Sequence, residues 1–471
     1  MASPYPEHPQ LSGNFAPLRS EIDAHDLVVH GEIPVDLAGT LLRIGPNPQY
    51  APLRDHHWFL GDGMVHGFYF ESGKVRYRNR WVRTPRFELE REHGESLFGM
   101  MGNPATTAKV AAGKDNGVAN TALVFHANRL LALEELHAPF EIDRQSLDSL
   151  GYYEFDGQLK GAMTAHPKID PQTGEMLFFC YFGNGPFTPE INFHVVDAKG
   201  KLLRSEQFKA PFPAMVHDFV VTSDYVLFPI FPLTADLDRA VSGGPPFAWE
   251  PEKGTWVGVM RRSDSVDNIR WLRTDPCYVF HPMNAWNDGE RIYADMMQFE
   301  EAPLFPHADG SPTDPKKANA RLCRWYIDLG SDSDAFTREY IDDLSAEFPR
   351  IDERRAGLDY KHGFYATSEK RDEGDKGAFN GIAHLDLATG KRRDFKLPGG
   401  DAVSEPVFVR RSDAAEEGDG YLLATAYRCN ENRSDLLIFD TDDIARGPIA
   451  VANLDTRVPY GFHGQWVSTN R

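Results

Sequence analysis

Residues 170–201, DPQTGEMLFFCYFGNGPFTPEINFHVVDAKGK, contain two runs of strand length between turn signals. The first run, EMLFFCYFG, follows the turn-forming DPQTG, and the second run, INFHVVD, precedes AKGK. Both runs are rich in β-branched and aromatic residues, which favour strands, whereas Gly, Pro and Asp favour the turns between them. The stretch therefore predicts consecutive antiparallel strands.

The same pattern recurs from about residue 117 onward. Its further examples are YVLFPIF at 225–231, RIYADMMQF at 291–299, LCRWYIDL at 322–329, IAHLDL at 382–387, YLLATAYR at 421–428 and SDLLIFD at 434–440. Successive hairpins without a linker argue for a β-propeller, in which radial repetition limits exposed strand edges. With four strands per blade, the chain would form roughly seven blades of about 50–65 residues. We predict an all-β fold that occupies residues 1–471 as a single domain with insertions.

Helical patterns are scarce in this sequence. The best candidate is PRFELEREHGESLFGMMG at 85–102, and a weaker one covers 342–347. Two polar stretches, 305–320 and 369–377, are typical of inserted loops.

Composition narrows the class of partner. The formal net charge is −20 and the sequence pI is near 5.3. Because phosphate binding depends on clustered Lys and Arg, and no basic run occurs, we expect no nucleic-acid partner. The segment MASPYPEHPQLSGNF lacks the pattern of a secretory signal, and no stretch approaches 18 uninterrupted apolar residues. We therefore expect a soluble, cytoplasmic protein; peripheral membrane contact stays open, although no segment indicates it.

The four cysteines, Cys180, Cys277, Cys323 and Cys429, are scattered and form no C-x-x-C pair. This spacing supports neither a disulfide framework nor a thiolate metal site.

Four histidines in distinctive local contexts indicate chemistry: His166 in TAHPKIDPQTGEM, His217 in MVHDFVV, His281 in CYVFHPMNAW and His463 in VPYGFHGQW. They are too far apart for a local metal finger, but their spacing suits a site to which several repeats each contribute one residue. Neutral imidazoles suit a redox metal such as iron(II), which keeps positions open for oxygen.

These four motifs, together with FLGDGMVHGF, NGVANTALVFH, EFPRID and VSEPVFVRR, resemble the carotenoid cleavage oxygenase family, which includes stilbene- and phenylpropanoid-cleaving enzymes. The resemblance runs from about residue 11 onward. It implies a seven-bladed propeller with one iron(II) per chain on its axis, held by His166, His217, His281 and His463. It also implies a cap of loops and short helices that forms an apolar tunnel.

The resemblance further implies that Glu135 orients His217, Glu347 orients His281 and Glu405 orients His463, which leaves His166 without a carboxylate. A carboxylate that accepts the second imidazole proton fixes both tautomer and ring angle. Because Glu134 and Glu135 are adjacent in the chain, a strand would point them to opposite faces. Thr121 matches a family threonine near an open coordination position.

The other histidines are better explained as structural. We expect His66 and His126 to buttress the fold, and the following six to be surface or hydrogen-bonded residues: His8, His25, His56, His57, His93 and His307.

The implied reaction is oxidative cleavage of a conjugated C=C bond by O₂, the co-substrate, to two carbonyl products from an apolar conjugated small molecule. Family members that cleave phenols have a tyrosine and a lysine at the phenol oxygen and a packing phenylalanine. The matching positions here are Phe59, Met101 and Glu134. Since a carboxylate repels a phenolate, we expect an apocarotenoid or similar polyene, with a stilbene or phenylpropene as the alternative.

Two hypotheses from other classes remain open at this point. One is a propeller hydrolase that uses carboxylates such as Glu347 and Asp352. The other is a binding scaffold without catalysis. Only the oxygenase requires both iron and O₂.

Overall fold

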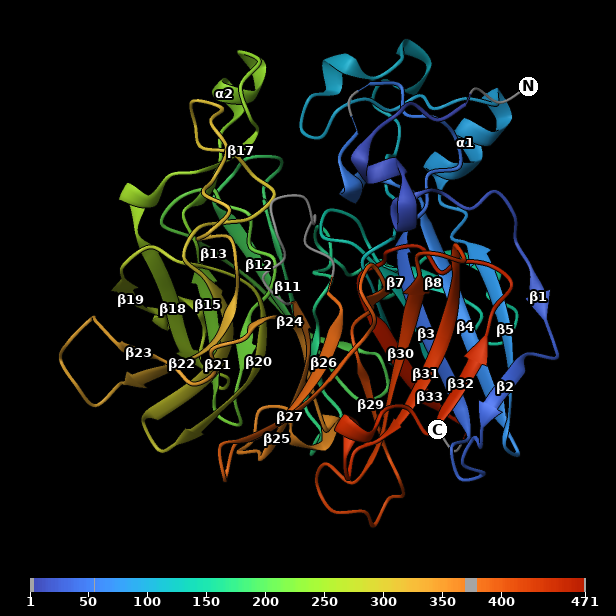
Figure 1. Ribbon diagram of the computed structural model, residues 1–471. Helices are drawn as coiled ribbons and strands as arrows, with labels where there is room; N and C mark the ends of the chain where they lie inside the picture. The colour runs from blue at the N-terminus through green and yellow to red at the C-terminus, as the bar shows by residue number, and fades with distance from the viewer. Residues whose placement is uncertain (1–3, 55, 369–378, 470–471) are drawn as a thin grey trace. The chain divides into compact units, whose positions relative to one another are not determined.

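The computed structural model describes residues 4–54, 56–368 and 379–469 of the 471-residue chain. Within these ranges antiparallel strands predominate, and the α-helices are α1 (Pro85–His93) and α2 (Leu237–Val241). The chain divides into two compact units: unit 1 comprises Met1–Glu154 and Glu373–Arg471, and unit 2 comprises Phe155–Asp372. Many of the elements of both units are labelled in Figure 1.

Unit 1 consists mainly of antiparallel sheets. Its strands are β1 (Asp23–Ala24), β2 (Val28–Gly31), β3 (Gly39–Pro46), β4 (Gly63–Glu71), β5 (Lys74–Trp81), β6 (Ala122–His126), β7 (Arg129–Leu133), β8 (Phe140–Ile142), β9 (Ser149–Tyr152), β26 (Gly381–Asp386), β27 (Lys391–Lys396), β28 (Ala402–Val403), β29 (Val407–Arg410), β30 (Gly420–Arg428), β31 (Arg433–Asp440), β32 (Ala450–Asn453) and β33 (Gly464–Ser468). Three sheets have the orders β1-β5-β4-β3-β33, β6-β7-β8-β9 and β2-β32-β31-β30-β28, and β29 also pairs with β30. β26 and β27 form an antiparallel hairpin.

Segments distant in sequence close two of these sheets. β33 pairs with β3 from Gly39↔Ser468 to Arg43↔Gly464, and β2 pairs with β32. The backbone approaches closely here, since a Cβ on Gly39 would lie 2.5 Å from the ring of Trp466. The position therefore requires glycine.

Unit 2 repeats the same architecture. Its strands are β10 (Lys168–Ile169), β11 (Met176–Tyr181), β12 (Glu190–Val196), β13 (Leu202–Lys209), β14 (Val220–Val221), β15 (Tyr225–Ile230), β16 (Leu233–Ala235), β17 (Phe247–Trp249), β18 (Thr255–Arg261), β19 (Arg270–Thr274), β20 (Tyr278–Asp288), β21 (Arg291–Phe299), β22 (Arg321–Asp328), β23 (Thr337–Tyr340), β24 (Ser345–Ile351) and β25 (His362–Ser368). The four-stranded sheets have the orders β10-β11-β12-β13, β14-β15-β18-β19 and β20-β21-β22-β23. β24 pairs with β25, and β16 with β17.

The turn before β11 forms as its residues predict. The carboxylate of Asp170 accepts the backbone N–H groups of Gln172 and Thr173 at 2.8 and 3.2 Å, and Gly174 has a positive φ of 73°. An Asx turn closed by a left-handed glycine reverses the chain in this way. The prediction of consecutive antiparallel strands over 170–201 is confirmed.

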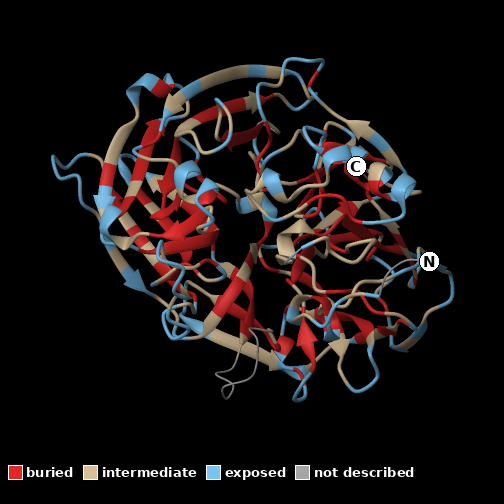
Figure 2. Ribbon diagram, turned by 90° about the horizontal axis from the view of Figure 1, so that it is seen from above, coloured by how far each residue is buried: buried red, intermediate tan, exposed pale blue. Residues whose placement is uncertain are grey.

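The core of unit 2 is aromatic. Phe179, Phe193, Phe219 and Phe228 are fully buried, and the ring of Phe228 lies 5.6 Å from that of Phe193 and 6.1 Å from that of Phe219. In Figure 2 the buried residues are concentrated in strands, whereas exposed residues mark turns and outer strands. Such a core makes the sheets rigid supports for the loops that join them.

Two helix predictions need correction. Helix α1 begins after Thr84, whose hydroxyl accepts the N–H of Phe87 at 3.2 Å, but it ends at His93 rather than near residue 102. Gly94 adopts a φ of 73° there and donates its N–H to Glu90 O, which terminates the helix. The weaker helix at 342–347 is wrong, because β24 begins at Ser345.

The loops, cysteines and helices agree with several further predictions. Residues 305–320 contain neither helix nor strand, as expected for a loop, while 369–377 lie outside the described residues. The four cysteines are free thiols. Of the helices in the described ranges, none has the length and apolarity that crossing a membrane requires. Short 3-10 turns occur at Pro9–Leu11, Gly13–Phe15, Trp58–Leu60, Pro104–Thr106, Lys109–Ala111, Pro251–Lys253, Val266–Asn268, Glu353–Arg355 and Ile444–Arg446.

Candidate metal centre

Three of the four singled-out histidines come from three successive sheets of unit 2. His166 precedes β10, His217 precedes β14, and His281 lies in β20. The register of β20 against β21 shifts between Val279 and Pro282. Since a bulge redirects the side chains beside it, this irregularity sets the direction of His281.

The three imidazoles converge through the same ring nitrogen. Nε2 of His166 lies 3.0 Å from Nε2 of His217, and Nε2 of His217 lies 3.2 Å from Nε2 of His281. His217 and His281 are buried, and His166 is nearly so. A donor nitrogen of His463 completes the group, in which all four nitrogens lie within 4.8 Å of one another.

A carboxylate holds the far side of His281. Nδ1 of His281 donates to Oε2 of Glu347 at 2.5 Å, and the same oxygen accepts the N–H of Phe348 at 2.5 Å. Because a carboxylate accepts only, Nδ1 carries the proton and Nε2 presents its lone pair toward His217. Glu347 is 5% exposed, and in the described part of the chain its Oε1 has no hydrogen-bond partner.

The local backbone explains how Glu347 reaches this position. The register of β24 against β25 shifts between Glu347 and Arg350, and Phe348 has a left-handed φ of 54°. A bulky residue adopts this conformation only at a cost of about 1–3 kcal/mol. The ring of Phe348 stacks on His281 with 5.4 Å between centroids, so the bulge supplies both an acceptor and a packing surface for the ligand.

His463 in unit 1 is held in the same manner. Its Nδ1 donates to Oε1 of Glu405 at 3.0 Å, while Oε2 accepts the N–H of Gly464 at 2.6 Å. Glu405 is 2% exposed. The guanidinium of Arg43 donates to the backbone carbonyl of Glu405 at 3.1 Å and thereby fixes the segment.

These donors fit a metal ion. Two nitrogens bound at about 2.1 Å and at right angles lie about 3.0 Å apart, whereas tetrahedral ligands lie about 3.4 Å apart. The observed 3.0 Å equals the right-angled value and the observed 3.2 Å lies midway between the two values, so both separations fit nitrogens that share one ion. Imidazoles with no thiolate, and carboxylates in the outer positions, suit a six-coordinate redox metal that keeps coordination positions open.

Two of the predicted pocket residues lie beside His463. The ring of Phe59 packs on that of Phe462 at 5.5 Å, and the carbonyl of Thr121 accepts the N–H of His463 at 3.3 Å. The hydroxyl of Thr121 donates to Asn120 at 2.9 Å. Met101 lies half-buried in the turn after α1. Their roles toward a substrate stay predictions.

Glu134 sits in a polar cluster. Its Oε1 accepts the N–H of Val118 at 3.1 Å and lies 2.7 Å from Nδ1 of His137. Burial lowers the pKa of His137, but the charge and hydrogen bond of Glu134, together with the charge of Asp115, raise it overall to about 8. At neutral pH the imidazolium therefore offsets most of the carboxylate's charge. Glu135, next in the chain, follows β7, and its pairing with His217 stays a prediction.

The other histidines singled out in the sequence lie outside the candidate ligand group. His66 is buried, its Nδ1 lies 2.8 Å from the hydroxyl of Tyr77, and burial lowers its pKa to about 3. His126 is buried in β6. In the described ranges, the six histidines predicted as surface or hydrogen-bonded residues lie outside the candidate ligand group.

Sequence reasoning missed an ion pair between Lys168 and Asp218. Nζ of Lys168 lies 2.7 Å from Oδ1 of Asp218, whose side chain is 4% exposed. Burial raises the pKa of Asp218, and Lys168 opposes that shift. The sequence offers one signal: each residue lies beside a singled-out histidine, Lys168 two positions after His166 and Asp218 directly after His217.

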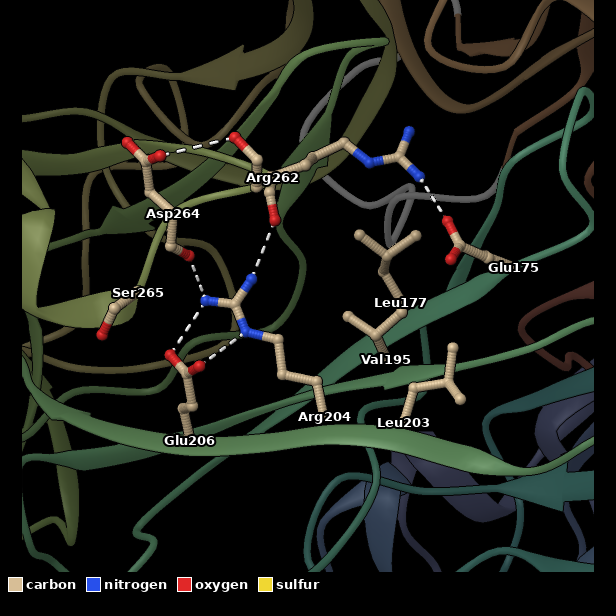
Figure 3. Close-up of a pocket in the computed structure, with 10 residues that line it drawn as sticks. Glu175, Leu177, Val195, Leu203, Arg204, Glu206, Arg262, Asp264 and Ser265 are labelled. Atoms are coloured by element: carbon tan, nitrogen blue, oxygen red, sulfur yellow. Dashed lines mark hydrogen bonds and ion pairs between the residues drawn. The ribbon is translucent and has the colours of Figure 1, made fainter.

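Unit 2 also has a groove of about 490 Å³ away from these histidines. Its charged groups are already paired, as Figure 3 shows: Arg204 with Glu206, and Arg262 with Glu175. Because these guanidinium groups already have partners, the groove has weaker claims to a ligand than the histidine cluster.

Comparison with known proteins gives the family. The model of the retinal pigment epithelial membrane protein (RPE65) family matches residues 15–468. The chain is 41% identical to the isoeugenol monooxygenase of Pseudomonas nitroreducens over 98% of both sequences. The solved lignostilbene dioxygenase of Pseudomonas brassicacearum is 38% identical, with a TM-score of 0.96 over 99% of this chain and 100% of that one. A variant of the Synechocystis apocarotenoid oxygenase is 26% identical, with a TM-score of 0.84 over 96% of this chain and 97% of that one.

The chain therefore belongs to the RPE65 and carotenoid cleavage oxygenase family. It has the predicted seven-bladed β-propeller fold, and it is an oxygenase of the class that cleaves C=C bonds. The hydrolase and scaffold hypotheses are not supported. Asp352 pairs with Arg354 at 2.5 Å rather than standing free as a catalytic carboxylate. The single-domain prediction and the cap over the metal stay predictions.

The comparisons favour the alternative substrate class, a stilbene or phenylpropene, over an apocarotenoid. Relatives named for isoeugenol and lignostilbene are more similar to this chain than the apocarotenoid oxygenase is. The expectation depended on Glu134 repelling a phenolate, but its pairing with His137 removes much of that repulsion.

Proposed function

We propose that this protein cleaves the side-chain double bond of a phenylpropene or phenolic stilbene with O₂, at one iron(II) held by His166, His217, His281 and His463. The convergence of Nε2 atoms, with Nδ1 of His281 and of His463 each bound by a buried glutamate, is the observation that carries this proposal.

The metal and the protein would contribute different parts of the reaction. When bound, iron(II) would supply activation of O₂, which no side chain here performs. Glu347 and Glu405 hold the ligands' protons on Nδ1, so that the Nε2 atoms direct their lone pairs toward the metal position. We assign Glu135 the same duty toward His217.

The surrounding apolar residues position the substrate. Phe59 and Phe462 pack edge to face beside His463, and Trp58 lies 4.3 Å from Phe462 between ring centroids. Aromatic surfaces of this kind suit a planar conjugated molecule. Thr121 narrows the approach to His463 with its methyl group. Selectivity then depends on which double bond these surfaces place over the metal.

The similarity to isoeugenol monooxygenase and lignostilbene dioxygenase supports the substrate class. The paired Glu134 and His137 fit a hydroxylated ring, because a carboxylate can accept a hydrogen bond from a neutral phenol.

The test loads the purified protein with iron(II) without oxygen and measures metal content. Isoeugenol, resveratrol and an apocarotenal are then supplied with O₂, while oxygen uptake is recorded and the aldehydes are identified by mass. We expect about one iron per chain, and at least about tenfold higher kcat/KM for isoeugenol or resveratrol than for the apocarotenal. Faster turnover of the apocarotenal would refute the substrate class. A preparation that takes up zinc only, with no oxygen consumption, would refute the metal assignment.

A further inference from the structure

A buried ion pair joins two of the segments that carry the candidate ligands. Lys168 Nζ lies 2.7 Å from Oδ1 and 3.0 Å from Oδ2 of Asp218. The Asp218 side chain is 4% exposed and that of Lys168 is 28% exposed. A carboxylate buried to this degree needs a compensating cation or hydrogen-bond donor to persist as an anion.

Asp218 also faces a ligand ring. Its Oδ2, one of the oxygens that contact Lys168, lies 3.8 Å from Nδ1 of His166. This distance is too long for a hydrogen bond, but it is within the range at which the two charges act on each other. Oδ1 is further engaged by the N–H of Phe219 at 2.7 Å.

A second bridge also joins these segments. Thr164 Oγ1 accepts the N–H of His166 at 3.1 Å and donates to the carbonyl of His217 at 3.5 Å. This bridge involves neither Lys168 nor Asp218. A purely structural role would therefore make the buried charges redundant.

Charge at the imidazole has a direct chemical consequence. An anion that approaches the N–H side of a ligating histidine makes the imidazole a stronger electron donor to the metal. Glu347 has this effect on His281. Lys168 and His166 compete for the same carboxylate, because Oδ2 of Asp218 lies between them.

We propose that the Lys168–Asp218 pair tunes how strongly His166 donates electrons to the metal. Lys168 holds the Asp218 anion too far from His166 for a full hydrogen bond, so that His166 is a weaker electron donor than His281 and His463, which are bound by carboxylates. Asp218 and Lys168 are thus positioning residues. The proposal rests on the proposed function, in which His166 is a metal ligand.

The test uses two substitutions that break the same ion pair. In Lys168→Met the freed carboxylate moves toward His166, so iron(II) binds at least about threefold more tightly and the Fe(III)/Fe(II) midpoint potential falls. In Asp218→Asn the anion is lost, so iron(II) binds about 10–100-fold more weakly and the potential rises. Chelator competition measures the affinity, and a spectroscopic redox titration measures the potential.

Two control variants distinguish tuning of His166 from a purely structural role of the ion pair. Lys168→Arg keeps the cation and should behave as wild type. Lys317→Met removes a comparable surface pair with Glu301 at 2.9 Å and should leave both readouts unchanged. A structural tie predicts that both test variants weaken iron binding, and shifts of the same sign, or none, overturn the proposal. If Asp218→Asn does not fold, the direction of the Lys168→Met shift alone decides. Failure of the wild type to bind iron at all would instead refute the proposed function.

Discussion

Nδ1 of His281 and Oε2 of Glu347 lie 2.5 Å apart, and the carboxylate that joins them sits on a bulge with a left-handed Phe348. The ligand's tautomer is therefore fixed by backbone geometry in the next sheet along the chain. The same bulge stacks Phe348 on the imidazole, so this histidine is restrained on two sides before any metal binds.

Replacing Glu347 with Gln should weaken iron(II) binding by about 10–100-fold, because the amide keeps the shape but loses the charge that makes His281 a strong donor. Chelator competition gives the dissociation constant. Glu300→Gln, at a surface glutamate that pairs with Arg321, is the matched control. An unchanged affinity in Glu347→Gln would remove the carboxylate from the outer shell of the site.

His281→Ala should lose iron and oxygen uptake while the fold persists, since stability in this protein resides in sheet packing such as the aromatic core of unit 2. Metal analysis should give less than about a tenth of an iron per chain, with an unaltered far-ultraviolet circular dichroism spectrum. Full activity in this variant would contradict the ligand assignment.

His137→Gln should destabilise the protein in a pH-dependent manner. The folded pKa of His137 is raised to about 8 by Glu134, against about 6.5 when unfolded. The resulting stability, about 2 kcal/mol, is fully present below pH 6.5 and is lost as pH rises through 8. Melting temperatures of variant and wild type should thus differ at pH 6 and converge by pH 9. His93→Gln, at an exposed position, serves as control; a gap that stays constant with pH would argue against the pair.

Phe228→Ala should lower the free energy of unfolding by about 3–5 kcal/mol, because it opens a cavity among Phe193, Phe208 and Phe219. Denaturant titration measures the loss. A cost below about 1 kcal/mol would mean that these rings are not a close-packed core.

Local pattern predicted the strands well, because turns such as DPQTG carry their own hydrogen-bonding groups. The local pattern predicted helices wrongly in two places, where a single glycine or a distant partner strand decides the structure. Gly94 ends α1 although apolar residues continue beyond it, and residues 342–347 lead into β24 because the partner strand β25 provides hydrogen bonds that no local pattern reveals.

The part of the site that lies within sequence motifs could be predicted. The four histidines and two of the glutamates come together in the expected contexts. The Asp218 and Lys168 pair was not foreseen, since its residues are distant in sequence and meet only through the folded sheets. The comparisons favour the alternative substrate class for a similar reason: the sequence does not reveal that His137, three residues later, offsets the charge of Glu134.

The pairing of β33 with β3 has a consequence for assembly during translation. Because β33 directly follows His463, the sheet that seats this imidazole stays one strand short until the ribosome has made residue 468. Under the proposed ligand set, cellular iron would be captured in full only after residues 463–468 have emerged from the ribosome, and shorter nascent chains would hold an incomplete, weakly binding trio.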